Sequence, residues 1–187
     1  MSSRFDISPT PIDGVSIVER KPIADERGFL VRIYAEDELA KLGFAGGIKQ
    51  INHTLTTSRG AIRGMHFQRP PHAETKLVTC IRGAVFDVAV DVRDGSPTFL
   101  QWHGEVLSPE NRRALLIPEG CAHGFQALED DCELLYLHSA AYEPSCEGAL
   151  NQADPRLAID WPLPVTDLSD RDRNHELLDD KFKGLSL

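Results

Sequence analysis

The chain has 187 residues, of which 41% are hydrophobic and 26% charged, and its formal net charge is −9. This length suffices for one domain with a sizeable core, and the acidic balance disfavours general binding to nucleic acids or to anionic membrane surfaces. No apolar run is long enough to span a bilayer, and the N-terminus lacks the apolar core of a secretory signal. The widely spaced cysteines, without any C-x-x-C pair, predict reduced, mostly buried thiols in a cytoplasmic protein.

The N-terminal third predicts short elements. Residues 1–14 are polar and rich in turn formers, and the alternation over 15–19 predicts a first strand. A turn at 25–28 precedes a predicted strand over 29–34. Residues 36–42 form the clearest predicted helix, with acids first, a lysine late and a glycine directly after the end.

The rest of the chain predicts many short strands separated by Gly and Pro. They are expected at 48–57, 62–68, 76–82, 84–92, 102–107, 114–117, 124–127 and 132–139. The alternation is strict over 84–92, where Val88 and Val90 share one face and Asp87 and Asp91 lie on the other. This pattern is typical of a β-sandwich or a closed barrel. The polar C-terminal tail is compatible with one short helix over 174–182.

Three side chains suited to proton transfer fall on predicted strands: His66, Lys76 and Tyr136. Beside a carbonyl, an imidazole removes the α-proton, an ammonium stabilises the enolate and a phenol returns a proton. Arg63, His66 and Gln68 are polar positions among apolar ones, as in the wall of a cavity. Each residue also has an ordinary explanation, as a packed histidine, a solvated lysine at a strand end or a core tyrosine.

Other chemistries have less support in the sequence. A barrel metal site typically needs an H-x-H pair followed by an acid, and Gln68 occupies the position of the second histidine, so no metal ligand is assigned. The chain has neither a G-x-S-x-G motif nor a G-x-G-x-x-G motif after a strand. Hydrolase and dehydrogenase functions are therefore disfavoured.

A series of motifs runs in order from about residue 15 to residue 172. They include Asp25-Glu26-Arg27-Gly28-Phe29, Gln50-Ile51-Asn52, Arg63-Gly64-Met65-His66-Phe67-Gln68, Lys76-Leu77-Val78, Pro118-Glu119-Gly120-Cys121-Ala122-His123-Gly124-Phe125 and Leu168-Ser169-Asp170-Arg171-Asp172. In this combination the chain resembles the dTDP-4-dehydrorhamnose 3,5-epimerases. The resemblance implies one all-β domain over 1–187, a cupin-type double-stranded β-helix (jelly roll) with a few short helices near 36–42 and at the C-terminus.

The resemblance also implies a reaction, namely cofactor-independent epimerisation at C3, C5 or both of a nucleotide-linked 4-keto-6-deoxy sugar. It implies His66 as general base, Asp172 as its partner, Lys76 as the enolate-stabilising group and Tyr136 as the acid on the opposite face. The implied substrate contacts are Arg27, Gln50, Asn52, Arg63, His123 and Tyr142. No metal and no organic cofactor is implied, and family members are homodimers whose N-terminal segments reach across to the partner.

The sequence departs from the common family pattern at Arg32, where many members carry a glutamate, and at Asn151-Gln152, which replaces a frequent Arg-Trp. These departures leave open the nucleotide, the sugar and which carbons are inverted. The alternatives are a single-site 3- or 5-epimerase, a ketoisomerase on another nucleotide sugar, a metal-dependent cupin or a non-catalytic sugar-binding jelly roll. A paired base and acid argue against the last, because binding alone requires neither.

Overall fold

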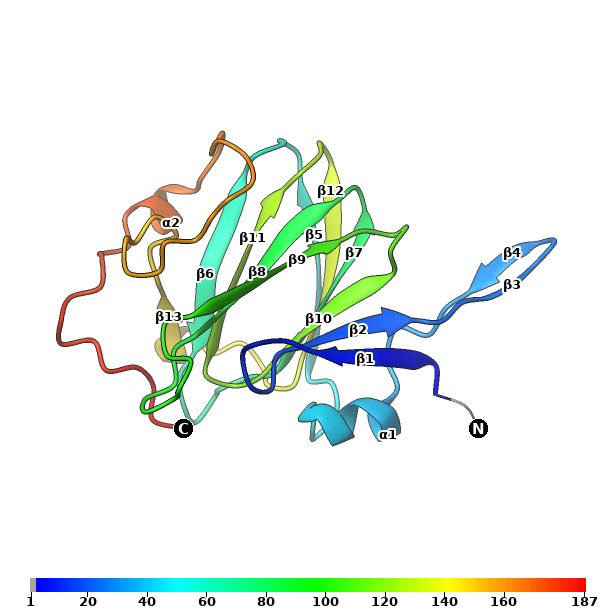
Figure 1. Ribbon diagram of the computed structural model, residues 1–187, viewed down its shortest axis with the longest axis horizontal. Helices are drawn as coiled ribbons and strands as arrows, with labels where there is room; N and C mark the ends of the chain where they lie inside the picture. Colours follow the sequence, from blue (N-terminus) through cyan, green and yellow to red (C-terminus); the bar gives the residue numbers. More distant parts are fainter. Residues whose placement is uncertain (1–2) are drawn as a thin grey trace.

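The computed structural model describes residues 3–187, which form two antiparallel sheets and a separate hairpin (Figure 1). The larger sheet has the order β1-β2-β10-β7-β12-β5, with strands at Phe5–Pro9, Ser16–Arg20, Arg113–Ile117, Lys76–Arg82, Cys132–His138 and Gln50–Thr56. The smaller has the order β13-β6-β11-β8-β9, with strands at Glu147–Ala149, Ile62–Gln68, Cys121–Ala127, Val85–Asp91 and Trp102–Leu107. Because β6, β7 and β8 alternate between the sheets, the chain crosses repeatedly from one to the other, and the expected all-β jelly roll is confirmed.

The main core lies between the two sheets. Val78 and Leu134 enter it from the six-stranded sheet, and Val85 and Phe125 enter it from the five-stranded sheet. Removing this apolar surface from water is the main force that holds the sheets face to face.

Both sheets are also covered on their outer faces. On the six-stranded sheet, Leu77 and Leu137 pack in one cluster with Leu39 of the helix α1 (Glu36–Leu39). On the five-stranded sheet, Val88 and Val90 pack under the C-terminal segment, which confirms the face predicted from the alternation in β8. Strands that are buried on both faces hold their side chains firmly, which suits them to position a site.

Two of the shorter elements differ from the sequence prediction. The helix predicted over 36–42 forms as α1 followed by a 3-10 turn, η1 (Ala40–Leu42), and ends at Gly43 with a φ of +94°. The prediction of a helix over 174–182 is wrong, since the only α-helix in the described C-terminal segment is α2 (Asp170–Arg173). It begins there because the Ser169 hydroxyl accepts a hydrogen bond from the Asp172 N–H.

Some strand boundaries were also wrong. The strand predicted over 29–34 is shortened to β4 (Gly28–Leu30), which pairs only with β3 (Ile23–Asp25). Conversely, β1 forms inside the segment interpreted as turn-rich, because it pairs with β2 along its whole length and buries Phe5. Strand β13 and the 3-10 turn η2 (Pro144–Cys146) were not predicted.

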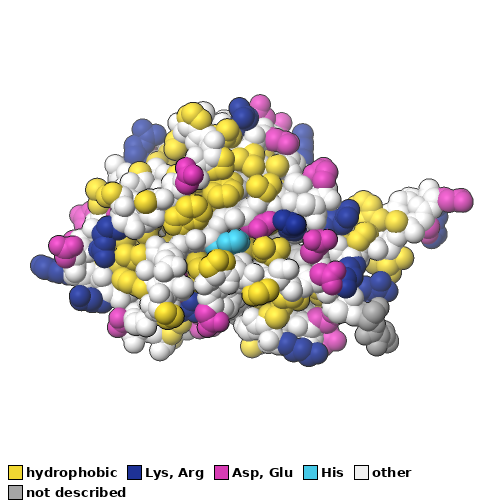
Figure 2. Space-filling view, in the orientation of Figure 1, with side chains coloured by type: hydrophobic (Ala, Val, Ile, Leu, Met, Phe, Trp, Pro, Cys, Tyr) yellow, Lys and Arg dark blue, Asp and Glu magenta, His cyan; other side chains and the backbone are white. Residues whose placement is uncertain are grey.

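The hairpin β3–β4 projects from the body of the molecule (Figure 1). Its apolar side chains Ile23, Phe29 and Leu30 are 49%, 70% and 66% exposed, and Figure 2 shows apolar side chains gathered on this projection. Large apolar side chains exposed together typically mark a contact surface. Within residues 3–187, no helix is both long enough and apolar enough to cross a membrane.

Candidate active site

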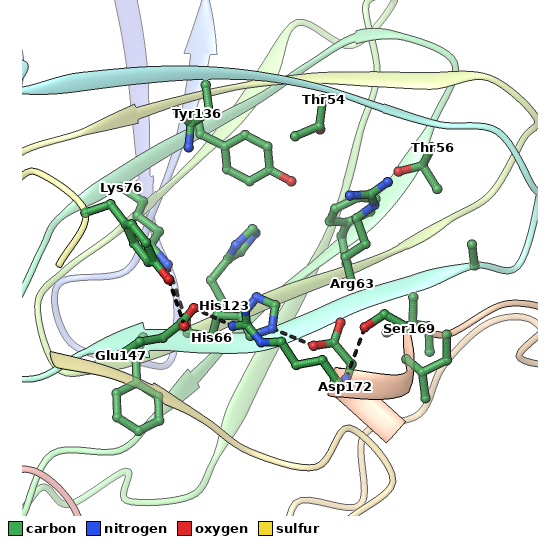
Figure 3. Close-up of a pocket in the computed structure, with 18 of the residues that line it drawn as sticks. Thr54, Thr56, Arg63, His66, Lys76, His123, Tyr136, Glu147, Ser169 and Asp172 are labelled. Atoms are coloured by element: carbon green, nitrogen blue, oxygen red, sulfur yellow. Dashed lines mark hydrogen bonds and ion pairs between the residues drawn. The ribbon is translucent and has the colours of Figure 1, made fainter. Parts of the chain in front are cut away.

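A cavity of about 630 Å³ opens between the two sheets and is lined mainly by β5, β6, β7, β11 and β12, with the turn before α2 (Figure 3). The cavity arises because the inward-facing side chains change from apolar to polar along the strands. On β12, Leu134 is part of the core, whereas Tyr136 and His138, two and four residues further on the same face, line the cavity. Polar residues that continue an apolar inner face keep a concave site open to water.

His66 and Asp172 form a hydrogen-bonded pair at one wall of this cavity. The His66 Nε2 atom lies 2.7 Å from Asp172 Oδ1, and the other carboxylate oxygen accepts a hydrogen bond from the Gly64 N–H at 3.3 Å. Burial raises the pKa of the Asp172 carboxyl, but the hydrogen bonds and charge of His66 outweigh it, so the pKa stays below its usual value. An ionised Asp172 therefore holds a proton on Nε2 and leaves Nδ1 of the ring as the basic nitrogen.

Gly64 is required for the position of this pair. Its φ is +133°, and a Cβ at Gly64 would lie 2.5 Å from the Cα of Gly124 on β11. Only glycine at both positions lets β6 and β11 approach this closely. The Arg63-Gly64 step of the sequence motif thus acts through the backbone beside His66.

Lys76 lies at the start of β7 within a buried polar cluster. Its ammonium donates to the His66 carbonyl oxygen at 3.3 Å and pairs with Glu74 at 3.2 Å, and its side chain is only 8% exposed. The second oxygen of Glu74 lies 2.8 Å from Nδ1 of His138. Glu74 thus compensates the buried charge of Lys76 and fixes its direction.

Tyr136 enters the cavity from the six-stranded sheet, opposite His66 on the five-stranded sheet (Figure 3). Its ring meets His123 edge to face at 5.7 Å and stacks on His138 at 6.2 Å. Burial first, and then the charge of Asp87, raises the pKa of the Tyr136 phenol above its usual value. The phenol therefore retains its proton at neutral pH and can act as a proton donor.

A second histidine–carboxylate pair lies deeper in the cavity. His123 Nε2 is 2.8 Å from Asp87 Oδ1, and both side chains are almost fully buried. His123 is directly opposite His66 in the register of β11 and β6, so the two imidazoles share one wall. The pairing with Asp87 fixes which nitrogen of His123 faces the cavity.

The outer part of the cavity carries exposed charge and one aromatic ring. Arg171 forms an ion pair with Glu147, whose other oxygen accepts a hydrogen bond from the Tyr142 hydroxyl at 3.0 Å. Arg63 lies on the cavity wall and donates to the Leu55 carbonyl oxygen at 3.1 Å. Two guanidinium groups and a half-exposed tyrosine form a surface suited to a diphosphate and a flat base.

The structure brings most of the predicted site residues together. Those that line the cavity are His66, Asp172, Lys76, Tyr136, Asn52, Arg63, His123 and Tyr142. Gln50 lies at its edge, where its side chain accepts from the Tyr142 N–H at 3.0 Å and donates to Asn52 at 3.0 Å. Arg27 is not brought to the cavity of its own chain, because it lies at the tip of the projecting hairpin, where it pairs with Asp25.

Several acidic or basic residues of the site were not predicted from the sequence, among them Glu74, Asp87, His138, Glu147 and Arg171. The position of Asp87 on the polar face of β8 was visible in the alternation, and Arg171 lies inside one of the quoted motifs. Nothing in the local sequence marks Glu74 or Glu147, since their partners His138 and Arg171 are 64 and 24 residues away.

Residues 9–180 match the family model for dTDP-4-dehydrorhamnose 3,5-epimerase. The chain is 41% identical over 175 residues to the dTDP-4-dehydrorhamnose 3,5-epimerase of Methanothermobacter thermautotrophicus, covering 92% of this chain and 94% of that protein. It is 42% identical over 173 residues to the dTDP-4-dehydrorhamnose 3-epimerase of Streptomyces niveus, covering 92% of this chain and 83% of that protein.

The fold of the chain also matches solved structures of this family. A crystal structure of dTDP-6-deoxy-D-glucose-3,5-epimerase from Legionella pneumophila, in complex with dTDP-4-keto-L-rhamnose, superposes with a TM-score of 0.89 at 39% identity. The match covers 98% of this chain and 99% of that chain.

Proposed function

This chain belongs to the dTDP-4-dehydrorhamnose 3,5-epimerase family, and we propose that it epimerises C3 and C5 of a nucleotide-linked 4-keto-6-deoxy sugar without a cofactor. The observation that carries the proposal is the placement of His66, with Asp172 behind it, and Tyr136 on facing walls of one cavity. Inversion of a carbon requires proton removal on one face and proton return on the other. A base and an acid on facing walls meet this requirement.

His66 is the proposed general base. Its Nδ1 takes the proton from the carbon beside the C4 ketone, while its Nε2–H remains hydrogen-bonded to Asp172 at 2.7 Å. The carboxylate holds the ring in this tautomer and stabilises the imidazolium that forms. The electron pair of the broken C–H bond moves onto the C4 oxygen, which becomes an enolate.

Lys76 is the proposed partner of that enolate oxygen. A buried ammonium placed beside the His66 carbonyl is a fixed positive charge, and it stabilises negative charge that develops next to it. Glu74, 3.2 Å from the ammonium, keeps it in position beside the His66 carbonyl oxygen.

Tyr136 is the proposed acid. Its raised pKa keeps the phenol protonated until the enolate carbon draws the proton from the wall opposite His66. The new C–H bond then lies on the face opposite the one that was broken, which inverts the centre. The phenolate is reprotonated from solvent before the next cycle.

The outer residues are proposed to hold the nucleotide diphosphate. Arg63 is suited to the phosphates, Tyr142 to the base, and Gln50, Asn52 and His123 to the polar groups of the ligand. In support, relatives with bound ligand carry dTDP or dTDP-sugars, such as dTDP-4-keto-L-rhamnose in the Legionella pneumophila enzyme.

We further propose that residues 1–187 act as one cytoplasmic domain that pairs into a homodimer, in which the hairpin β3–β4 of each subunit reaches the other. The exposed apolar side chains of the hairpin support this arrangement. It would bring Arg27, which lies away from the cavity of its own chain, to the cavity of the partner subunit. Sedimentation analysis should give twice the monomer mass. Arg27→Ala should then raise KM more than it lowers kcat.

Proton NMR of the purified protein with dTDP-4-keto-6-deoxyglucose in D2O tests the reaction. Deuterium at both C3 and C5 is expected, because each inversion replaces the abstracted proton by one from solvent. If neither C3 nor C5 takes up deuterium, and the corresponding CDP- and GDP-sugars are also unchanged, the proposal is refuted.

A single-site 3-epimerase is the second candidate. It is favoured by the relative from Streptomyces niveus, which is named a 3-epimerase and, at 42% identity, is as similar to this chain as the 3,5-epimerase of Methanothermobacter thermautotrophicus at 41%. Deuterium at C3 alone would identify this outcome.

A further inference from the structure

His175 lies beside the catalytic pair but has no role in the reaction as proposed. Its Nε2 atom is 3.7 Å from Asp172 Oδ1, and its ring meets the ring of His66 edge to face at 6.4 Å. Among residues 3–187, this Nε2 atom is buried without any hydrogen-bond partner. An imidazole nitrogen that is removed from water and unpaired requires an explanation.

The three side chains together have the composition of a metal site. His66, Asp172 and His175 each offer one ligand atom, and these atoms all lie within 4.8 Å of one another. In tetrahedral zinc sites with bonds of 2.0–2.2 Å, ligand atoms are separated by about 3.4 Å. The 2.7 Å and 3.7 Å separations on either side of Asp172 Oδ1 bracket that value, and the third pair lies within 4.8 Å, so shifts of about 1 Å suffice.

The surroundings also suit a cation. The second oxygen of Asp172 is already held by the Gly64 N–H, which leaves Oδ1 directed at the two imidazoles. His175 is fixed by its backbone, because Asn151 donates its side-chain N–H to the His175 carbonyl oxygen at 2.7 Å.

We propose that His66, Asp172 and His175 bind a divalent transition-metal ion such as Zn²⁺, and that the bound ion reversibly inhibits the enzyme. The three protein ligands leave a fourth position for water, as in zinc sites with three protein ligands. The ion replaces the proton between His66 Nε2 and Asp172. This inference rests on the proposed role of His66 as general base.

Inhibition follows from the tautomer of His66. In the metal-free enzyme the ring carries its proton on Nε2, facing Asp172, and has its lone pair on Nδ1. When the ion takes the lone pair of Nε2, the single proton of the neutral ring moves to Nδ1. Nδ1 then becomes a donor, and the nitrogen that faces the sugar can no longer accept a proton.

Calorimetric titration of untagged protein with Zn²⁺ tests the site directly, on the wild type, on His175→Gln and on His53→Gln. His53 is a matched control, because its Nε2 also contacts a carboxylate, Glu133 at 2.8 Å, but outside the cavity. The wild type and His53→Gln should bind one ion with the same affinity. His175→Gln should bind at least about tenfold more weakly, because a ligand is lost.

Turnover measured over a Zn²⁺ series should follow the same order. Wild type and His53→Gln should be inhibited and fully recovered by EDTA, whereas half-inhibition of His175→Gln should need at least about tenfold more metal. The uninhibited rate of His53→Gln should equal that of the wild type, and the inhibition of each protein is expressed relative to its own rate without metal. Equal zinc affinity and equal inhibition in wild type and His175→Gln would overturn the proposal.

A measurement on the wild type alone avoids dependence on any variant. In ¹⁵N-histidine-labelled protein, the His66 proton should reside on Nε2 without metal and on Nδ1 with Zn²⁺. A tautomer that does not change on saturation would also overturn the proposal. If the wild type shows no turnover, the proposed function fails, but calorimetry and NMR still decide whether the metal site exists. If the wild type turns over substrate but binds no zinc, only the metal site is refuted.

Discussion

Replacing Asp172 by asparagine is the most discriminating change at the reaction centre. The side chain keeps its shape, but it has only one oxygen to satisfy two donors, the His66 Nε2–H at 2.7 Å and the Gly64 N–H at 3.3 Å. If the oxygen faces Gly64, the amide N–H₂ faces His66 and drives its proton to Nδ1. If the oxygen faces His66, two donors meet at Gly64 and the negative charge is still lost.

The size of the effect follows from the charge and from the tautomer. Opposite charges about 4 Å apart attract by about 4 kcal/mol at an effective dielectric constant of about 20. Because the His66 side chain is 31% exposed, we take about half of this for the imidazolium–carboxylate attraction. Each 1.4 kcal/mol is about tenfold in rate. With the further loss of the base tautomer, we expect kcat to fall by about 10²- to 10⁴-fold.

The assay is the initial rate of deuterium incorporation into dTDP-4-keto-6-deoxyglucose, followed by proton NMR. Circular dichroism and the melting temperature check that Asp172→Asn is folded. His53→Gln is the control, since it alters a histidine–carboxylate contact outside the cavity and leaves the His66–Asp172 pair in place. An Asp172→Asn rate close to that of His53→Gln would refute the assignment of Asp172 as the partner of the base.

Three further changes test separate parts of the structure. Tyr136→Phe should lower product formation by about 10²- to 10⁴-fold, while deuterium still enters recovered substrate, because proton removal does not need the phenol. Glu74→Gln should lower the free energy of unfolding in urea by about 3 kcal/mol, since it leaves the Lys76 ammonium buried and unpaired. Despite its burial, Asp91 has a pKa lowered to about 2 by its hydrogen bonds, and Asp91→Asn should remove about 2 kcal/mol of stability at pH 7.

The sign of the pH effect follows from the lowered pKa of Asp91. The contribution is complete above its unfolded-state pKa of about 3.9 and is lost as the pH falls through about 2, so wild type and Asp91→Asn should converge in that acidic range. Equal stability at pH 7 would contradict this account. The assignment of Tyr136 would fail if the variant lost exchange and product formation equally. The buried pair would be in question if Glu74→Gln unfolded within about 1 kcal/mol of wild type.

The local elements of the sheets and the chemical nature of the site could be predicted from the amino-acid sequence. Strands β7 and β9 occupy the ranges that the sequence predicts, and the alternation in β8 places Val88 and Val90 on one buried face. These features could be predicted because side-chain periodicity and turn residues act over a few neighbouring positions. The motifs that carry the family resemblance could be recognised for the same reason, since each is a contiguous run of residues.

Which groups act together could be seen only once the strands were packed in three dimensions. His66 and Asp172 are separated by 106 residues, and His123 and Asp87 by 36, so their pairing depends on how the strands and α2 are brought together. The end of the chain shows the same limit, because α2 begins at the Ser169 cap instead of in the segment predicted as helical, and so turns Asp172 towards His66. Contacts of this kind depend on which distant strands pair, and the alternation within a single strand does not specify its partner.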